Sequence, residues 1–151
     1  MSRSERIRRF YDELYKKYGP QGWWPGDSPL ECIVGAILTQ STSWKNVEKA
    51  ISNLKNESLL SVERLSLVTA EELAALVRSS GYYNQKAIKI KNFISFLNSG
   101  YGGSLEKMFG EDKSVLRKKL LAVKGIGPET ADSIVLYAGG MPVFVVDAYT
   151  W

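Results

Sequence analysis

Apolar side chains recur every three or four residues along most of the chain, and this spacing predicts helices rather than strands. Strict alternation of apolar and polar residues, which marks a half-buried strand, is rare. The pattern therefore predicts an all-α fold. We expect helices over residues 4–18, 29–39, 44–54, 70–79, 84–97, 114–123 and 128–137.

The segment 29–39 is apolar almost all round, which predicts a helix buried on every side at the centre of the fold. Ser28 and Glu31 form a capping-box pattern around Pro29, so the start of this helix is well marked. A second capping box opens the helix expected over 70–79.

The segment 84–97 is basic on one side, and five apolar residues are expected on its buried side: Ile88, Ile90, Phe93, Ile94 and Leu97. We expect a glycine-rich loop over 98–104 and a short extended run over 143–146. No repeat, low-complexity tract or interdomain linker is visible. A length of 151 residues suits one domain, so we expect residues 1–151 to form a single helical core.

Composition narrows the chemistry. Lysine and arginine outnumber aspartate and glutamate by 20 to 16, giving a net charge of +4, which permits a polyanionic partner without establishing one. Histidine is absent, which excludes Ser-His-Asp and Cys-His catalysis and any His-ligated zinc in this chain. The single cysteine, Cys32, is expected to be a small buried hydrophobe. No apolar run is long enough to span a bilayer, so we expect no membrane partner.

The segment Lys124-Gly125-Ile126-Gly127-Pro128 joins two expected helices through glycines at alternate positions. Glycine permits positive φ and lets the backbone approach a ligand closely. The second helix directs unpaired N–H groups and its positive dipole end forward, which suits a phosphate. Because Pro128 has no N–H, the expected donors are Gly127, Glu129 and Thr130. The turn alone is equally typical of a tight helix–helix connection.

The complete segment 120–132 resembles the helix-hairpin-helix of the endonuclease III-like (HhH-GPD) superfamily of DNA glycosylases. The resemblance implies the all-α glycosylase core, with double-stranded DNA that contains a damaged base as the partner. It also implies that the hairpin, with Lys124, grips the DNA backbone, and that carbonyls near Val123 and Gly125 can hold K⁺ or Na⁺.

An aspartate follows the hairpin by about twenty residues in that superfamily, after a short extended segment, and Asp147 matches it here. The resemblance makes Asp147 the catalytic residue. Cleavage of an N-glycosidic bond builds oxocarbenium character on the sugar, which a fixed carboxylate stabilises while it orients or deprotonates water. Taken alone, Asp147 is equally typical of a helix N-cap, and the two roles can coexist.

Bifunctional members of the superfamily carry a lysine nucleophile two residues after the second hairpin glycine, where this chain has Glu129. Lys124 lies on the other side of the turn and does not match that position. The resemblance therefore implies a monofunctional enzyme that leaves an abasic site without cutting the strand.

A glycosylase takes its base out of the stack and fills the vacated space. The segment 38–42 resembles the family segment whose glutamine enters the duplex, and 81–87 resembles one whose residue after glycine wedges the opposite strand. These roles fall to Gln40 and Tyr82, and Lys86 in the second segment is expected to contact DNA.

Trp23 and Trp24 lie in a Gly/Pro loop, and Trp44 follows the segment of Gln40. Indole faces stack on bases and attract an electron-poor, cationic purine, although tryptophans also serve cores. Together with Glu129, these residues resemble the 3-methyladenine glycosylase branch. The resemblance implies a base pocket of Trp23, Trp24, Trp44 and Glu129 that selects an N-alkylated purine.

Members of the superfamily continue for further helices after the catalytic aspartate, some with an iron–sulfur cluster, whereas this chain ends at residue 151. We therefore expect a core that lacks its C-terminal helices, an exposed apolar face on the first helix, and self-association or domain swapping. A cluster would need cysteines from outside these residues, and this chain alone is expected to be weakly active or inactive. The expected location is the cytoplasm, with the nucleoid.

Three alternatives remain open. The first is a glycosylase for mismatched or oxidised bases. The second is a non-catalytic helix-hairpin-helix module, which would bind DNA in a salt-sensitive, lesion-independent way. The third is a helical protein with no nucleic-acid role.

Overall fold

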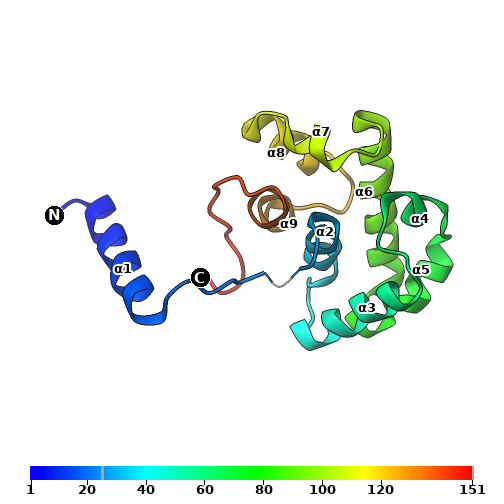
Figure 1. Ribbon diagram of the computed structural model, residues 1–151, viewed down its shortest axis with the longest axis horizontal. Coiled ribbons are helices and arrows are strands. Elements are labelled where there is room, and N and C mark those ends of the chain that lie inside the picture. The colour runs from blue at the N-terminus through cyan, green and yellow to red at the C-terminus, as the bar shows by residue number, and fades with distance from the viewer. Residues whose placement is uncertain (25, 151) are drawn as a thin grey trace.

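The computed structural model describes residues 1–24 and 26–150, and within them every regular element is helical, which confirms the all-α prediction (Figure 1). The elements are α1 (Arg3–Tyr18), α2 (Pro29–Leu38), α3 (Trp44–Asn56), α4 (Val62–Leu67), α5 (Ala70–Leu76), the 3₁₀ turn η1 (Arg78–Ser80), α6 (Tyr83–Tyr101), α7 (Leu105–Phe109), α8 (Lys113–Leu121), α9 (Pro128–Ser133) and the π-type turn η2 (Ile134–Ala138).

Helix α2 lies at the centre of the fold, as its composition predicts. Every residue from Leu30 to Leu38 is buried, and the helix contacts α3, α6, α9 and η2. Its first turn is capped because the Ser28 hydroxyl accepts from the Glu31 N–H at 3.2 Å. The reciprocal half of the expected box is replaced, since the Glu31 carboxylate accepts from the Asp27 N–H and pairs with Lys55 at 3.1 Å.

The long helix α6 departs from the prediction at its end and on one face. It continues through the expected loop to Tyr101, whose ring packs against Phe96, and ends at Gly102 in the left-handed conformation. Tertiary packing of this last turn outweighs the loop signal of its glycines. Ile88, expected on the buried side, is 52% exposed because it lies on the opposite face from Ala87 and Ile90.

Two short helices, α4 and α7, were not predicted. Each is shorter than two turns and buries a single residue, Leu65 in α4 and Met108 in α7, so neither shows apolar periodicity. The helix expected over 128–137 is present, but its second half widens into the π-helix η2. The run 143–146 lies in a segment without helix or strand.

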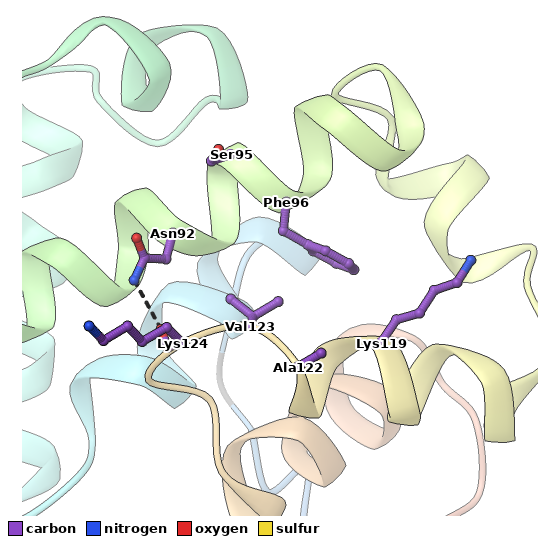
Figure 2. Close-up of a pocket in the computed structure, with 7 residues that line it drawn as sticks. All are labelled: Asn92, Ser95, Phe96, Lys119, Ala122, Val123 and Lys124. Atoms are coloured by element: carbon purple, nitrogen blue, oxygen red, sulfur yellow. Dashed lines mark hydrogen bonds between the residues drawn. The ribbon is translucent and has the colours of Figure 1, made fainter.

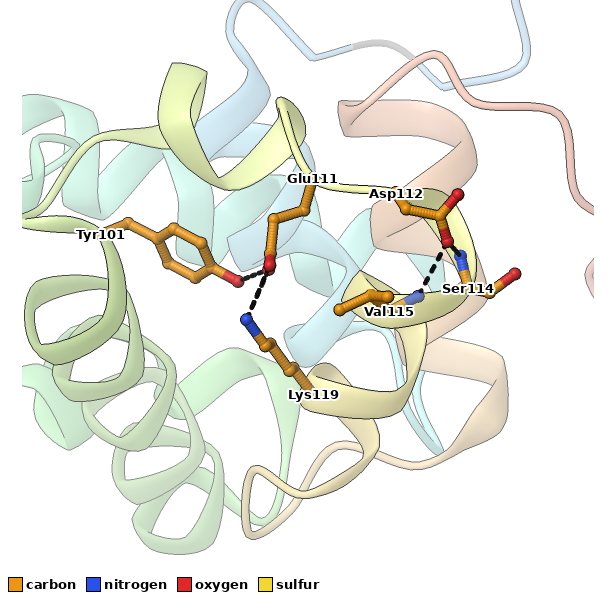
Figure 3. A network of polar contacts seen from close by, with 6 residues as sticks. All are labelled: Tyr101, Glu111, Asp112, Ser114, Val115 and Lys119. Carbon is orange, nitrogen blue, oxygen red and sulfur yellow. Dashed lines mark hydrogen bonds and ion pairs between the residues drawn. The ribbon is translucent and has the colours of Figure 1, made fainter.

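Polar networks fix the hairpin helices to the rest of the core. Glu111 accepts a hydrogen bond from the Tyr101 hydroxyl and pairs with Lys119 of α8 at 2.7 Å, which joins the end of α6 to α8 (Figure 3). Arg117 of α8 makes a bidentate pair with the buried Asp132 of α9, at 2.6 and 3.1 Å. The first contact therefore ties the hairpin to α6 through α8, and the second ties the two helices of the hairpin to each other.

Helix α1 stands apart from the other helices (Figure 1). None of its residues is buried, and its apolar side chains are exposed: Ile7, Phe10, Tyr11, Leu14, Tyr15 and Tyr18. Within the described part of the chain, no helix combines the length and apolar character needed to cross a membrane.

Candidate active site and nucleic-acid interface

The turn between α8 and α9 uses its two glycines differently. Gly125 has φ +97°, and a Cβ there would overlap Cγ of Lys89, so both conformation and space require glycine. Gly127 has an ordinary φ of −92°, and a Cβ would meet nothing within 4 Å. The expectation of positive φ therefore holds only for Gly125, whereas Gly127 opens onto free space in front of α9.

In the first turn of α9, the side chains of Glu129 and Thr130 differ in their exposure. Glu129 is exposed at the surface. Thr130 is only 2% exposed, and its hydroxyl accepts a hydrogen bond from Gln40 at 2.5 Å. The Thr130 side chain thus faces the core, while the contact expected between its main-chain N–H and a phosphate stays a prediction.

Asp147 begins a tight turn in the segment that follows η2. Its Oδ1 accepts from the Tyr149 N–H at 2.9 Å and from the Thr150 hydroxyl at 3.1 Å, and its own N–H donates to Thr150 Oγ1 at 3.0 Å. This is a capping arrangement, which uses one carboxylate oxygen. Among residues 1–24 and 26–150, no hydrogen-bond donor reaches Oδ2, so this oxygen is available to a ligand.

Two other titratable groups, Glu129 and Tyr137, are influenced by the charge of Asp147. Partial burial, and next the negative charge of Asp147, raise the pKa of the Glu129 carboxyl. The same two causes, in the same order, raise the pKa of the Tyr137 hydroxyl. Asp147 therefore lies within electrostatic reach of both the first turn of α9 and the turn η2.

Tyr137 also connects this carboxylate to an aromatic cluster. Its ring stacks on Trp24 with centroids 5.0 Å apart and planes 24° apart. Trp24 in turn meets Trp44 edge-on at 5.4 Å. Tyr137 was not among the residues predicted from the sequence. Its spacing of eight residues from Glu129 would have suggested that the two lie on one face of a helix. Trp23, expected in the pocket, is 71% exposed and does not belong to this cluster.

The two expected wedge residues differ in their present state. Tyr82 is 68% exposed and holds a left-handed backbone with φ 43°, so its ring projects into solvent. Gln40 is half-buried: its amide N–H donates to Thr130, and its Oε1 accepts from Lys89 Nζ at 2.9 Å. Gln40 is therefore held against the hairpin.

Lys86 does not lie on the DNA-facing surface, which corrects its expected role. Its side chain is 2% exposed, and its ammonium donates to the carbonyls of Leu38, at 2.8 Å, and Ser80. Position 86 shares the buried face of α6 with Ala87 and Ile90, so the lysine is bound inside the fold.

Lys124 lies at the start of the turn between α8 and α9 and is exposed. It lines a groove of 460 Å³ between α6 and the end of α8, together with Asn92, Phe96 and Lys119 (Figure 2). The Lys124 carbonyl accepts from Asn92 Nδ2 at 3.0 Å.

The side chains offer little for a metal centre. Cys32 is the only cysteine and is buried, as expected. Among the residues that the structure describes, no group of three His, Cys, Asp or Glu could hold a metal ion. An iron–sulfur cluster is therefore not supported by this chain.

Comparison with known proteins bears on this site. Residues 34–151 match the family described as HhH-GPD superfamily base excision DNA repair protein. A protein of Methanocaldococcus jannaschii, provisionally named a DNA repair glycosylase, is 49% identical over 97% of this chain and 67% of its own length. Endonuclease III of Thermotoga maritima is 32% identical over 80% of this chain, and the match spans 53% of its length.

Solved structures give the same picture. The chain superimposes on the H. pylori 3-methyladenine DNA glycosylase bound to 1,N6-ethenoadenine with a TM-score of 0.81 and 34% identity, over 96% of this chain and 68% of that one. For an endonuclease III–DNA complex the TM-score is 0.77 and the identity 26%, over 99% and 66%. The chain thus spans between about half and two thirds of the length of these relatives.

Proposed function

The chain belongs to the HhH-GPD superfamily of base excision DNA repair proteins, and from this premise we propose that it is the core of a monofunctional DNA glycosylase for N-alkylated purines. The observation that carries the proposal is the position of Asp147, which lies within electrostatic reach of Glu129 and Tyr137 and has one carboxylate oxygen that no donor among residues 1–24 and 26–150 contacts. Tyr137 stacks on Trp24, so a catalytic anion and an aromatic surface adjoin one another.

The chemistry follows from a fixed anion beside the sugar. As the bond between C1′ and the base nitrogen breaks, its electron pair leaves with the base, and positive charge develops on the sugar. The Asp147 carboxylate stabilises that charge and accepts a proton from the water that attacks C1′. The products are the free base and an abasic site.

The aromatic cluster supports an alkylated purine as the substrate. Such a base is cationic, so it departs as a neutral molecule and is drawn to the faces of electron-rich rings. Trp24, Trp44 and Tyr137 offer such rings, and Glu129 adds a carboxyl group at the rim. Similarity to a 3-methyladenine DNA glycosylase favours the same substrate class. Trp23 precedes Trp24 in the sequence and is exposed, so it would join the pocket only after its loop closes on DNA.

Hydrolysis without strand cleavage is supported by the place of the lysines. Glu129 stands where a Schiff-base lysine would be needed, and Lys124 lines the groove between α6 and the end of α8. Borohydride should therefore trap no covalent complex between the protein and lesion DNA. A trapped adduct would mean that an amine of this protein attacks the sugar.

On duplex DNA, Gly127, Glu129 and Lys124 would contact phosphates, while Gln40 and Tyr82 enter the stack on either side of the vacated position. The Val123 carbonyl accepts one hydrogen bond, from the Ile126 N–H at 3.0 Å, and keeps a lone pair. With the Gly125 carbonyl it could hold K⁺ or Na⁺, whose charge would attract a phosphate. A chromosomal substrate implies work at the nucleoid.

The decisive experiment measures base release from duplexes that each contain one defined lesion, with the released bases identified by mass. We expect release of 3-methyladenine and related alkylpurines, and Asp147→Asn should reduce it on the order of a thousandfold while lesion binding is retained. Glu57→Gln, a change at an exposed carboxylate just after α3, serves as the control. Release of only mismatched or oxidised bases would overturn the substrate, and release of none would overturn the enzyme.

A further inference from the structure

Lys86 is the largest side chain in the fold that is both charged and fully buried, and the chemistry proposed above does not use it. Burial, and next the positive charge of Lys89, lower the pKa of its ammonium group. A buried ammonium is costly unless hydrogen bonds replace its water. Here both partners are main-chain carbonyls, from Leu38 and from Ser80.

These two carbonyls belong to different segments, 42 residues apart in the sequence. Leu38 is the last residue of α2, and Ser80 is the last residue of η1. Carbonyls at helix ends lack partners within the helix and attract cations. One ammonium group therefore joins the last residue of α2 directly to the last residue of η1, and α3 packs against both elements.

The two segments are those that carry the proposed wedges. Gln40 follows Leu38 by two residues, and Tyr82 follows Ser80 by two. Both loops also contain a strained left-handed residue without glycine's freedom, Ser41 with φ 54° and Tyr82 with φ 43°. Loops with such backbones keep their shape only where the surroundings hold them.

Resting on the proposed function, we propose that Lys86 is a positioning residue that fixes the spacing of the Gln40 and Tyr82 loops. Both side chains must enter the duplex at one vacated position, so an error in their separation would penalise extrusion of a paired base. Lys89, one turn further along α6, also contacts the first loop, because its Nζ donates to Gln40 Oε1. Lys86 itself never touches DNA.

The test compares Lys86→Met, which keeps length without hydrogen bonding, with Lys86→Arg. Lys91→Met is the matched control, because Lys91 Nζ also binds main-chain carbonyls, those of Leu65, Ser66 and Val68, far from both loops in the sequence. In amide hydrogen exchange, Lys86→Met should raise exchange in both 39–42 and 80–83, whereas Lys91→Met raises it around 65–69. A change in only one loop, or in neither, would overturn the proposal.

Measurements of kcat/KM on two substrates distinguish a positioning role of Lys86 from a general loss of stability. On a lesion paired in a duplex, Lys86→Met should lower kcat/KM by about 30-fold, but by less than about threefold on the same lesion in a bulge, where unpairing is already done. Lys86→Arg should recover part of the loss. Equal losses on both substrates would indicate a merely structural lysine.

Salt dependence gives a second readout. Because Lys86 releases no counterions from DNA, the slope of log affinity against log salt should be unchanged in Lys86→Met, whereas Lys124→Met should make it shallower by about one. A shallower slope in Lys86→Met would mean that the ammonium group of Lys86 contacts a DNA phosphate, which would overturn the proposal. If the wild type releases no base at all, the proposed function fails, and hydrogen exchange still decides whether Lys86 joins the loops.

Discussion

Two carboxyl groups near one another have a measurable consequence at the scale of single residues. Partial burial, and next the negative charge of Asp147, raise the pKa of the Glu129 carboxyl, so its ionised form is disfavoured in the folded protein. In the unfolded chain both influences are lost. The folded state therefore holds the Glu129 proton more tightly, and the ionised carboxylate opposes folding at every pH above its folded pKa.

Replacing Glu129 by Gln should relieve this opposition. We expect Glu129→Gln to raise the free energy of unfolding near pH 7, with the gain shrinking as the pH falls below the folded pKa of Glu129, where the carboxyl is already protonated. Urea denaturation at pH 7 and at pH 4 would measure it. A gain that is equal at both pH values would rule out a charge effect.

The same pair offers a check on geometry that needs no activity. In Asp147→Asn the pKa of Glu129 should fall toward its ordinary value, because one of the two causes that raise it is removed while burial remains. Carboxyl NMR titration with labelled glutamate would follow it. An unchanged titration of Glu129 would mean that Asp147 does not face it in solution.

At the scale of elements, the hairpin divides two tasks between its glycines. Gly125 serves the fold, since its positive φ and its contact with Lys89 exclude a side chain. Gly127 has neither requirement and faces open space. A glycine that the fold does not need indicates a surface that something else approaches closely, which agrees with a DNA backbone in front of α9.

Gly127→Ala is therefore expected to fold normally and to bind DNA about tenfold more weakly, through loss of close backbone approach. Gly100→Ala is the control, because its Cβ would also meet nothing within 4 Å and lies on α6. Thermal unfolding and fluorescence anisotropy would measure the two effects. Affinity equal to the wild type would leave Gly127 without a role in binding.

At the scale of the whole molecule, α1 is the element without a covering partner. Its apolar residues form one stripe, while basic residues precede acidic ones along its flanks. Two copies packed antiparallel, with the twofold axis near Phe10, would place Arg6 near Glu13 of the second copy and Arg8 near Asp12. A parallel pair would bring like charges together. The charge pattern thus favours antiparallel self-association through α1.

We expect sedimentation equilibrium to show a dimer that Leu14→Glu converts to a monomer, because a carboxylate would enter the apolar stripe. Glu13→Arg should weaken the dimer a few-fold, and adding Arg6→Glu should restore it. A monomer at all concentrations, or no rescue in the double variant, would exclude this arrangement.

Local patterns along the chain were sufficient for much of the fold and part of the site. The apolar circumference of 29–39 required a central helix, because no polar face remained for solvent. The alternate glycines before Pro128 marked the hairpin, and the resemblance to the HhH-GPD superfamily then made Asp147 and Glu129 candidate site residues. Each of these features depends on residues close together in the sequence.

Only the tertiary structure decided where polar side chains point. Lys86 and Thr130 have the composition of surface residues, but α2, α6 and α9 enclose them and supply their hydrogen bonds. Tyr137 became a site residue because Trp24, 113 positions earlier, stacks on it. The physical reason is that the partner of a buried polar or aromatic group is set by packing between distant elements, which helical periodicity does not encode.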